Sequence, residues 1–291
     1  MKILITGGSG FIGSYLSKKL SEEGHEVLIY DIKKPKNKIN YLKGDVLNFQ
    51  LLKKAVKNKD VVFHLAAVSS VQDSFKNPLK TFEVNISGTF NVLKASLESG
   101  IKRVIFASSA SVYGNQGKIK LKENMLPKPR SFYAISKLTG EHLCKMFYEE
   151  YGLETVILRY FNVYGPKQQE NVIKIFLENL KKGKEIIIYG DGKQKRDFIH
   201  IDDVTRANIL AMKTQKAKGK VFNIGTGEGC TILQLIQTIS QILGKRPKIR
   251  FLKERKGDIK YSVADIMLAK KILRFDPKMD LKTGLLTLLK S

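Results

Sequence analysis

Short apolar runs alternate with stretches of helical periodicity from the first residues of the chain to Arg159. The predicted strands are Lys2–Thr6, His25–Tyr30, Ile39–Lys43, Asp60–Leu65, Lys102–Ser108 and Glu154–Arg159, and the predicted helices are Phe11–Glu23, Phe49–Lys57, Pro78–Ser99 and Tyr133–Tyr151. Strands that are apolar almost throughout and alternate with helices are typical of a parallel sheet between two helical layers. The pattern predicts an α/β fold with a doubly wound parallel sheet of the Rossmann type.

Beyond Gly165-Pro166 the alternation becomes less regular. The predicted helices here are Val172–Lys182, Asp203–Lys213, Ile232–Leu243 and Ala264–Leu273, the last of which closes the chain, and the predicted strands are Glu185–Tyr189 and Lys220–Ile224. Because no long linker separates this part, we expect a smaller α/β lobe packed on the sheet, with the substrate in the cleft between them. We assign 1–165 to the sheet domain, with 198–228 returning to it, and 166–197 and 229–291 to the lobe.

The composition is that of an ordinary globular protein. Of the 291 residues, 43% are apolar and 9% aromatic, and the two cysteines, Cys144 and Cys230, are expected to be reduced core residues. A strand predicted at the first residue leaves no room for a signal peptide, and the longest apolar runs are too short to cross a bilayer. We therefore expect a soluble, cytoplasmic protein with no membrane partner.

The charge is the unusual property, since 52 Lys and Arg against 27 Asp and Glu give a formal net charge of +25. A chain that neutralises phosphates in this way could bind nucleic acid. However, the cations are mostly scattered Lys residues, without an aromatic-interleaved basic motif or zinc-ligand spacing. We favour a solvated Lys-rich surface, which heat-adapted proteins also have, and expect no nucleic-acid partner.

The first candidate for chemistry is the run Gly7-Gly8-Ser9-Gly10-Phe11-Ile12-Gly13, between the first predicted strand and the first helix. Glycines permit a tight turn and let the backbone approach a pyrophosphate, which the helix N-terminus attracts. Asp31, at the end of the second predicted strand, can bond ribose hydroxyls and would repel a 2′-phosphate. Asp is also an ordinary turn residue, and Lys33 and Lys34 would suit NADP, but the context favours NAD as the cofactor.

A second candidate is the pair Tyr133 and Lys137, which the i, i+4 spacing places on one face of a helix. An ammonium, together with a positive nicotinamide ring, lowers the pKa of a phenol, so that the phenolate can act as a base near neutral pH. This spacing alone is common on helices. It gains weight from Ser108-Ser109 at the carboxyl end of a strand, the edge at which doubly wound sheets bind ligands.

Together these motifs resemble those of the extended short-chain dehydrogenases/reductases, specifically the NAD-dependent nucleotide-sugar epimerases and dehydratases of the UDP-glucose 4-epimerase type. The matching runs extend over nearly the whole chain and are Thr6–Gly13, Gly44–Val46, His64–Ala67, Ser108–Gly114, Tyr133–Lys137, Arg159–Pro166, Gly190–Gly192, Arg196–His200 and Arg255–Asp258. Any one of them alone would be weak evidence, but the set is specific.

The resemblance implies a role for each matching residue. Ser109, Tyr133 and Lys137 would form the catalytic group; Gly7, Gly10, Phe11, Ile12, Gly13, Asp31, Asp45, Val46 and Ala66, with Tyr133 and Lys137, would contact NAD; and Asn162, Tyr189, Arg196, Arg255, Asp258 and Ser262 would contact the nucleotide sugar. Arginine pairs phosphate oxygens through two parallel hydrogen bonds, which agrees with these roles. The alternative is that each Arg or Tyr is an ordinary surface residue.

The residues after Ser109 distinguish between the reactions of the family. Its dehydratases carry an acidic pair and its decarboxylases a Glu where this chain has Ala110 and Ser111. Elimination without a carboxylate lacks its general acid and base, so this departure favours 4-epimerisation of a nucleotide sugar, for which UDP-hexose is the first choice, through a transient 4-keto intermediate. A dehydratase or reductase of the family, and a non-catalytic protein that senses NAD or a nucleotide sugar, stay open as alternatives.

The resemblance also bears on sugar size and assembly. Ser262, with Tyr261 one step away, falls at the position that faces the C2 substituent of the sugar, and its small side chain leaves room for an N-acetylhexosamine. The helices Pro78–Ser99 and Tyr133–Tyr151 resemble those that pair in dimers of relatives, so we expect a homodimer.

The histidines are the remaining candidates for metal or acid–base chemistry. Neither His64 nor His200 has a second ligand at metal-binding spacing, so we expect no metal. We expect His64, at the end of an apolar strand, to be a hydrogen-bonded core residue. We expect His200 to orient the loop around Arg196.

Overall fold

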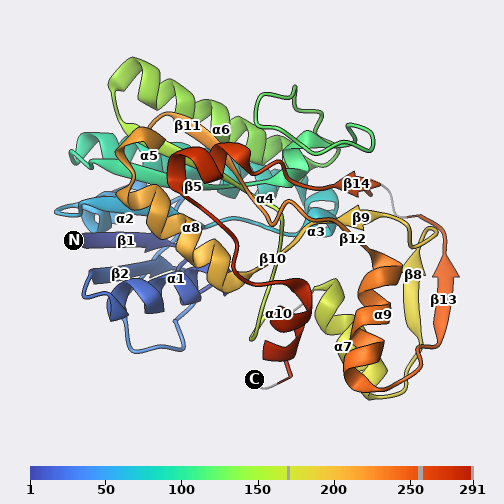
Figure 1. The fold of residues 1–291 in the computed structure, drawn as a ribbon. Helices are drawn as coiled ribbons and strands as arrows, with labels where there is room; N and C mark the ends of the chain where they lie inside the picture. The colour runs from blue at the N-terminus through green and yellow to red at the C-terminus, as the bar shows by residue number, and fades with distance from the viewer. Residues whose placement is uncertain (169–170, 255–257, 290–291) are drawn as a thin grey trace.

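The computed structural model describes residues 1–168, 171–254 and 258–289 of the chain. A seven-stranded parallel sheet has the order β11-β6-β5-β4-β1-β2-β3 (Figure 1). Its strands are β1 (Lys2–Thr6), β2 (Glu26–Asp31), β3 (Asn40–Lys43), β4 (Val61–His64), β5 (Arg103–Ser109), β6 (Glu154–Tyr160) and β11 (Lys220–Ile224). The chain builds outward from β1 in one direction and then from β4 in the other, so the predicted doubly wound fold is confirmed.

Helices cover both faces of this sheet. On one face lie α1 (Phe11–Glu22) and α8 (Ile201–Lys213), and on the other lie α2 (Phe49–Val56), α5 (Gly88–Glu98) and α6 (Phe132–Tyr151). Alternate residues of β1 point into the two cores: Ile3 and Ile5 into the first, and Leu4 into the second. A strand buried on both faces must be apolar throughout, which is the pattern that the sequence shows.

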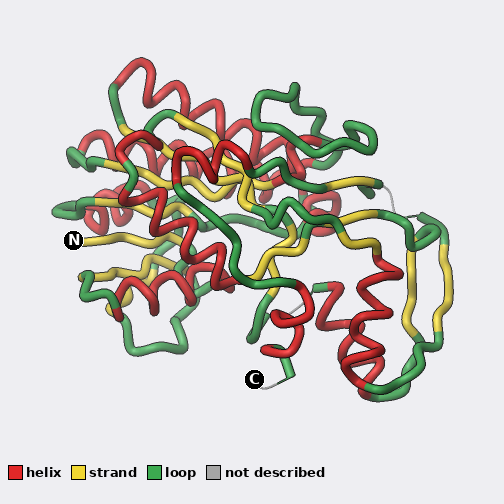
Figure 2. The backbone as a smooth tube through the Cα atoms, in the orientation of Figure 1, coloured by secondary structure: helices red, strands yellow, loops and turns green. Residues whose placement is uncertain are grey.

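The smaller lobe lies to one side of the large sheet (Figure 2) and has a hydrophobic core of its own. Its elements are α7 (Val172–Lys181), β8 (Ile186–Tyr189), α9 (Ile232–Leu243), β13 (Ile249–Leu252) and α10 (Leu281–Thr287). Two further small sheets pair β7 (Asn162–Tyr164) with β10 (Phe198–His200), and place β9 (Lys195–Arg196) between β12 (Cys230–Thr231) and β14 (Tyr261–Ser262). Helix α8 and strand β11, which come between β10 and β12 in the sequence, belong to the large sheet and its core.

The stretch Pro78–Ser99, predicted as one helix, is divided in the structure. A π-helical turn at Glu83–Ser87 separates α4 (Pro78–Phe82) from α5, and the short helix α3 (Val71–Lys76) precedes them. In this turn Asn85 is buried, and its side chain bonds the backbone of Val68 and the hydroxyl of Ser136. These partners are distant in the sequence, so periodicity alone could not reveal the turn.

The end of the chain also differs from the prediction. The predicted helix Ala264–Leu273 begins later, because Ala264 pairs with Leu121 as an isolated bridge, and its last five residues are π-helical. Ala269 and Leu273 pack into the core of the large sheet, not into the lobe to which we assigned 229–291. This segment does not close the chain, since α10 follows it.

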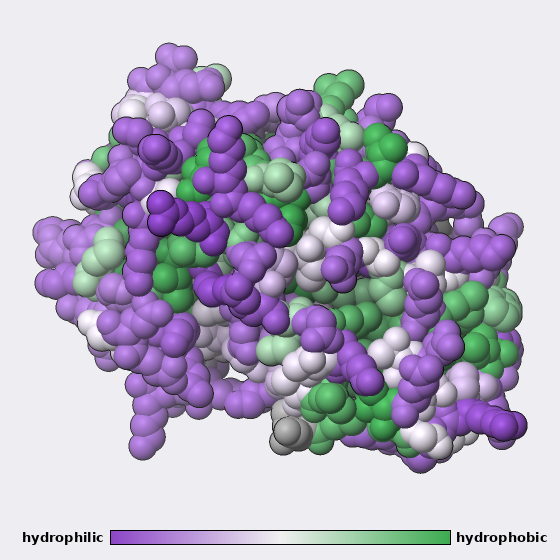
Figure 3. Space-filling view, in the orientation of Figure 1, coloured by the Kyte–Doolittle hydropathy of each residue, from purple (hydrophilic) through white to green (hydrophobic). Residues whose placement is uncertain are grey.

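Hydrophilic side chains cover most of the face shown in Figure 3, with apolar patches among them. No helix in the described part of the chain combines the length and the apolar character needed to cross a bilayer. Both cysteines are free thiols: Cys144 is buried and Cys230 half-buried.

Candidate active site

The glycine-rich turn between β1 and α1 leaves space for an anion at the start of the helix. Gly7 has φ +71°, and a Cβ atom there would lie 2.5 Å from the backbone nitrogen of Ala66. A Cβ atom on Gly13 would lie 2.3 Å from the carbonyl oxygen of Gly7. Side chains are thus excluded where the turn, the end of β4 and α1 meet, and the first amides of α1 can bind a pyrophosphate.

The other residues predicted to contact the cofactor lie along the same edge of the sheet. The Asp31 carboxylate, half-buried at the end of β2, accepts the amides of Ser9 and Lys33, each at 2.9 Å. Past the end of β3, Val46 is buried and Asp45 is exposed. Gly10 caps α1, Phe11 and Ile12 begin it, and Ala66 follows β4. This edge fits a dinucleotide, while the individual contacts stay predictions.

Ser109, Tyr133 and Lys137 meet where the end of β5 lies against α6. The Ser109 hydroxyl is hydrogen-bonded to the Tyr133 phenol. The Lys137 ammonium donates a hydrogen bond of 2.8 Å to the carbonyl oxygen of Ala107. Its nitrogen lies 6.0 Å from the centre of the Tyr133 ring and 5.0 Å from that of Phe106. The structure therefore brings together the three side chains that the sequence indicated.

Burial acts on both ionisable members of this group. It lowers the pKa of Lys137 to about 8, and the nearby carboxylate of Glu141 opposes this shift. Burial raises the pKa of Tyr133, while the hydrogen bond with Ser109 lowers it. The phenol is therefore the stable form in the protein alone, and formation of the phenolate needs a further positive charge nearby.

The local sequence explains how α6 presents these side chains. The Ser131 hydroxyl caps the helix by accepting the amide of Ala134 at 3.1 Å, and Gly152, with φ +71°, ends it. Gly140 permits close packing on β5, because a Cβ atom there would lie 2.5 Å from the ring of Phe106. The cap and this close approach determine where the helix begins and how near it lies to the strand.

Three of the predicted substrate residues gather around β9. The Arg196 guanidinium forms an ion pair of 2.6 Å with the carboxylate of Asp258. Ser262 lies opposite Arg196 in the pairing of β14 with β9, and its side chain is buried. Tyr261 is half-buried and lies opposite Lys195. An arginine held in this way can present its remaining N–H groups to a diphosphate.

The other predicted substrate residues are more dispersed. The Asn162 side chain donates a hydrogen bond of 3.1 Å to the carbonyl oxygen of Asp197, beside β9. Tyr189 is half-buried at the end of β8, in the smaller lobe. Arg255 lies outside the described residues. The geometry thus joins Asn162 to the Arg196 region and leaves the role of Tyr189 as a prediction.

The sequence interpretation missed Asp197, which organises this region. Its fully buried carboxylate accepts the amide and hydroxyl of Thr226 at 2.8 and 2.7 Å, and the amides of Gly227 and Ala264 at 2.9 and 3.2 Å. It thereby ties the strand end at Arg196 to the loop after β11 and to the residues after β14. A charged residue directly before an apolar run was the available signal, because buried carboxylates require such partners.

The two histidines have structural partners. His64 is buried between the hydroxyls of Thr6 and Thr89, at 2.8 and 2.9 Å, and burial lowers its pKa to about 3. The expectation for His64 is confirmed. His200 instead caps α8, and its ring is hydrogen-bonded to the Thr287 hydroxyl at 3.2 Å. The expectation that His200 orients the loop around Arg196 is therefore wrong, and Asp197 holds that loop. In the described ranges, no three His, Cys, Asp or Glu side chains gather as a metal site would require.

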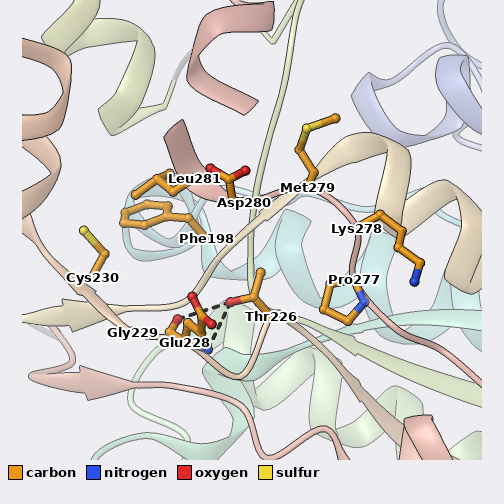
Figure 4. Close-up of a pocket in the computed structure, with 10 residues that line it drawn as sticks. All are labelled: Phe198, Thr226, Glu228, Gly229, Cys230, Pro277, Lys278, Met279, Asp280 and Leu281. Atoms are coloured by element: carbon orange, nitrogen blue, oxygen red, sulfur yellow. Dashed lines mark hydrogen bonds between the residues drawn. The ribbon is translucent and has the colours of Figure 1, made fainter. Parts of the chain in front are cut away.

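Two hollows open in this part of the molecule. The larger, of about 270 Å³, lies between the loop Thr226–Cys230 and the start of α10 (Figure 4). It contains none of the predicted site residues. The smaller, of about 170 Å³, is lined by Asn162 and by Asn171, a polar residue that the sequence interpretation did not select. The catalytic group lines neither hollow, so hydrogen bonds rather than cavity size locate the candidate site.

Comparison with known proteins agrees with this geometry. The model of the NAD dependent epimerase/dehydratase family matches residues 3–225. The UDP-glucuronate 4-epimerase of Thermodesulfobacterium geofontis is 34% identical over 302 residues, which cover 97% of this chain and 93% of that protein. The UDP-N-acetyl-alpha-D-glucosaminuronate decarboxylase of Bacillus cytotoxicus is 35% identical over 309 residues, which cover 98% and 95%.

Solved structures are similar over the full length of the chain. The UDP-glucose 4-epimerase of Thermotoga maritima with UDP-glucose has a TM-score of 0.95 at 37% identity and covers 100% of this chain and 98% of its own. The UDP-glucuronic acid 4-epimerase of Bacillus cereus, with UDP-glucuronic acid and NAD, has a TM-score of 0.94 at 35% identity and the same coverage. The UDP-N-acetylglucosamine 4-epimerase of Methanobrevibacter ruminantium has a TM-score of 0.92 at 36% identity and covers 99% and 98%.

Proposed function

Because the chain belongs to the NAD-dependent epimerase/dehydratase family, with NAD as its cofactor, we propose that it is a 4-epimerase of UDP-hexoses. The observation that carries this proposal is the meeting of Ser109, Tyr133 and Lys137 at the end of β5, followed by Ala110 and Ser111 instead of carboxylates. Such a group can remove a proton from a hydroxyl, but offers no second acid for elimination at a neighbouring carbon.

In the proposed mechanism the residues of the chain move one proton. The Tyr133 oxygen takes the proton of the sugar 4-hydroxyl, the Ser109 hydroxyl bonds the same sugar oxygen, and the Lys137 ammonium stabilises the phenolate. NAD, held by the glycine-rich turn and Asp31, would supply the acceptor and donor for the C4 hydride. Arg196 and Asn162 would hold the diphosphate while the 4-keto sugar turns over and presents its other face. Tyr133 then returns its proton, and the product differs only at C4.

Two other functions are alternatives to 4-epimerisation. A relative is a decarboxylase, so the chain could act on a UDP-hexuronic acid without epimerising it. Ala110 and Ser111 argue against a dehydratase or decarboxylase, since neither of the two positions directly after Ser109 holds a carboxylate. A non-catalytic sensor of NAD or nucleotide sugar is the second alternative, and the assembled catalytic group argues against it.

The deciding experiment incubates the protein with NAD and, separately, with UDP-glucose, UDP-galactose, UDP-glucuronate and UDP-N-acetylglucosamine. Proton NMR of the sugar then identifies the product. We expect the 4-epimer at constant total UDP-sugar. Release of carbon dioxide, or a 4-keto-6-deoxy product, would replace the proposal with one of the family's other reactions, and binding without turnover would favour the sensor.

Assembly and location form a second part of the proposal. The helices α4 and α5 both pack against α6. Each of the three exposes apolar side chains, namely Leu79 on α4, Phe90 on α5, and Ile135 and Met146 on α6. Isolated exposed apolar residues are common, but a group over adjacent helices suits a partner surface. We propose that two chains pair through these helices in a cytoplasmic homodimer without nucleic acid. Sedimentation of the wild type and of the Phe90→Asp variant tests whether the protein is a dimer. Passage over immobilised DNA without retention, at low and at high salt, tests the expected absence of nucleic-acid binding.

A further inference from the structure

Three consecutive residues at the end of β5 each hold one residue of α6. The pairs are Ala107 with Lys137, Ser108 with Glu141, and Ser109 with Tyr133. The three helix residues follow each other at intervals of four, so they lie on one face of α6. The mechanism uses the first and third pairs, and it leaves the second without a role.

The second pair continues into the next strand. Glu141 is 1% exposed, and its two oxygens accept the Nε and Nη2 groups of Arg159 at 2.8 and 2.6 Å. Arg159 lies opposite Ser108 in the pairing of β6 with β5, and its guanidinium lies 4.6 Å from the centre of the Tyr113 ring. The Glu141 carboxylate is therefore held from two neighbouring strands, one of which ends at the catalytic serine.

Stability alone is a weak reason for such a pair. Removing two charges from water costs several kcal/mol, and apolar residues of the same size often replace a buried ion pair without loss of stability. The position of this pair, one helical turn beyond the catalytic lysine, suggests a use. A carboxylate there attracts the ammonium, and its bonds to two strands fix the rotation of α6.

We propose that Glu141 is a positioning residue for Tyr133 and Lys137, which keeps α6 in register with β5 and keeps the Lys137 side chain in its ammonium form. The catalytic part of this inference rests on the proposed function. The part that concerns the charge of Lys137 stands without it, because it depends only on the charged groups of the chain itself.

The groups that act on Lys137 support this assignment. Burial lowers its pKa to about 8, and Cys144 and Glu141 of the same helix act in the opposite direction. Burial raises the pKa of the Cys144 thiol, which therefore stays uncharged at neutral pH. From β4, His64 interacts with Lys137 but is neutral at neutral pH, because burial lowers its pKa to about 3. Among these groups Glu141 supplies the negative charge, and Arg159 of β6, which pairs with Glu141, carries an opposing positive charge.

The sign of the effect can be tested with Glu141→Gln. A lysine with a lowered pKa loses its ammonium form as the pH rises through that value, so loss of the carboxylate moves the transition to lower pH. We expect the transition of Lys137 to move down by about one pH unit, the lower end of the shifts that an opposite charge nearby causes. It is read from the Cε carbon shift of Lys137 in protein labelled with 13C-lysine, assigned by its loss in Lys137→Met.

Further variants separate the charge from the fit. Glu141→Asp keeps the charge but shortens the reach to Ser108, so we expect the Lys137 transition at the wild-type pH. Glu149→Gln removes an exposed carboxylate from the same helix and serves as the matched control, with no change expected. Circular dichroism establishes that each variant is folded. If Glu141→Gln does not fold, the Glu141/Arg159 double substitution to Gln and Met takes its place. It removes a negative and a positive charge together, so we expect the Lys137 transition to stay near the wild-type pH while kcat falls, because α6 loses its ion pair with β6. An unchanged kcat in this folded variant would overturn the positioning role.

Activity provides a second readout. In Glu141→Gln the alkaline fall of kcat should move to lower pH together with the Lys137 transition, while KM for the UDP-sugar stays within about twofold, because Glu141 does not contact substrate. An unchanged Lys137 transition in a folded Glu141→Gln protein would overturn the inference. If the transition moves but no epimer forms in any variant, the positioning role stands and the proposed reaction is wrong.

Discussion

The carboxylate of Asp31 accepts the backbone amide of Ser9 at 2.9 Å, and so ties the end of β2 to the glycine-rich turn after β1. A second amide, that of Lys33, bonds the other carboxylate oxygen. These bonds keep the carboxylate in a defined place, beside the turn that is predicted to receive the pyrophosphate. Ribose hydroxyls of a bound dinucleotide can still donate to its free lone pairs.

We expect this arrangement to make the protein bind NAD more tightly than NADP, by about tenfold or more. A 2′-phosphate would lie against Asp31, and like charges about 4 Å apart repel by about 4 kcal/mol at the effective dielectric of a protein surface. Titration calorimetry on cofactor-free protein measures both affinities. In Asp31→Ser the preference should shrink, and equal affinities in wild type would contradict the role of Asp31.

Tyr133→Phe should lower kcat by about 10²- to 10⁴-fold, because a positioned acid–base group contributes about that much. The affinity for NAD should change little, since only the phenolic oxygen is lost. Tyr151→Phe, at an exposed position on the same helix, is the matched control and should behave as wild type. Near-normal turnover of Tyr133→Phe would assign the proton transfer to another group.

Ser262→Tyr should impair turnover of UDP-N-acetylglucosamine far more than that of UDP-glucose. Ser262 is buried beside Arg196, where a larger side chain would occupy the space that an acetamido group needs. Ser262→Ala preserves that space and should retain both activities. The two substrates are compared by kcat/KM in each variant. If Ser262→Tyr handles both sugars as wild type does, the selecting residue lies elsewhere, with neighbouring Tyr261 the first to examine.

Arg103→Met should destabilise the protein by about 3–5 kcal/mol, the usual cost of breaking a buried ion pair. Arg103 is 2% exposed, pairs with Glu154 at 2.6 Å, and donates to carbonyl oxygens at the end of α8, among them that of Met212 at 2.8 Å. Urea denaturation followed by circular dichroism measures the change. Exposed Lys102→Met is the control, for which we expect a change within about 0.5 kcal/mol. A similarly small change for Arg103→Met would show that solvent replaces its bonds.

Features that the sequence predicts well are those encoded in neighbouring positions. β1 and α1 follow their apolar periodicity, and the helix that carries Tyr133 and Lys137 begins one residue from its predicted start. The long predicted helix from Pro78 is the informative exception. Its periodicity is helical, but the buried Asn85 side chain donates hydrogen bonds to the carbonyl oxygen of Val68 and to the hydroxyl of Ser136. At this residue the helix has a π-helical turn.

The sequence by itself determined the alternation of strands and helices, the glycine turn and the spacing of Tyr133 and Lys137, because each depends on residues close together in the chain. Only the tertiary structure decided how the buried carboxylates act. Glu141 pairs with Arg159 of β6, and Asp197 accepts the amide of Thr226, which lies in the loop after β11. A carboxylate can be buried only if such partners reach it, and the packing of distant segments, not local sequence, brings them there.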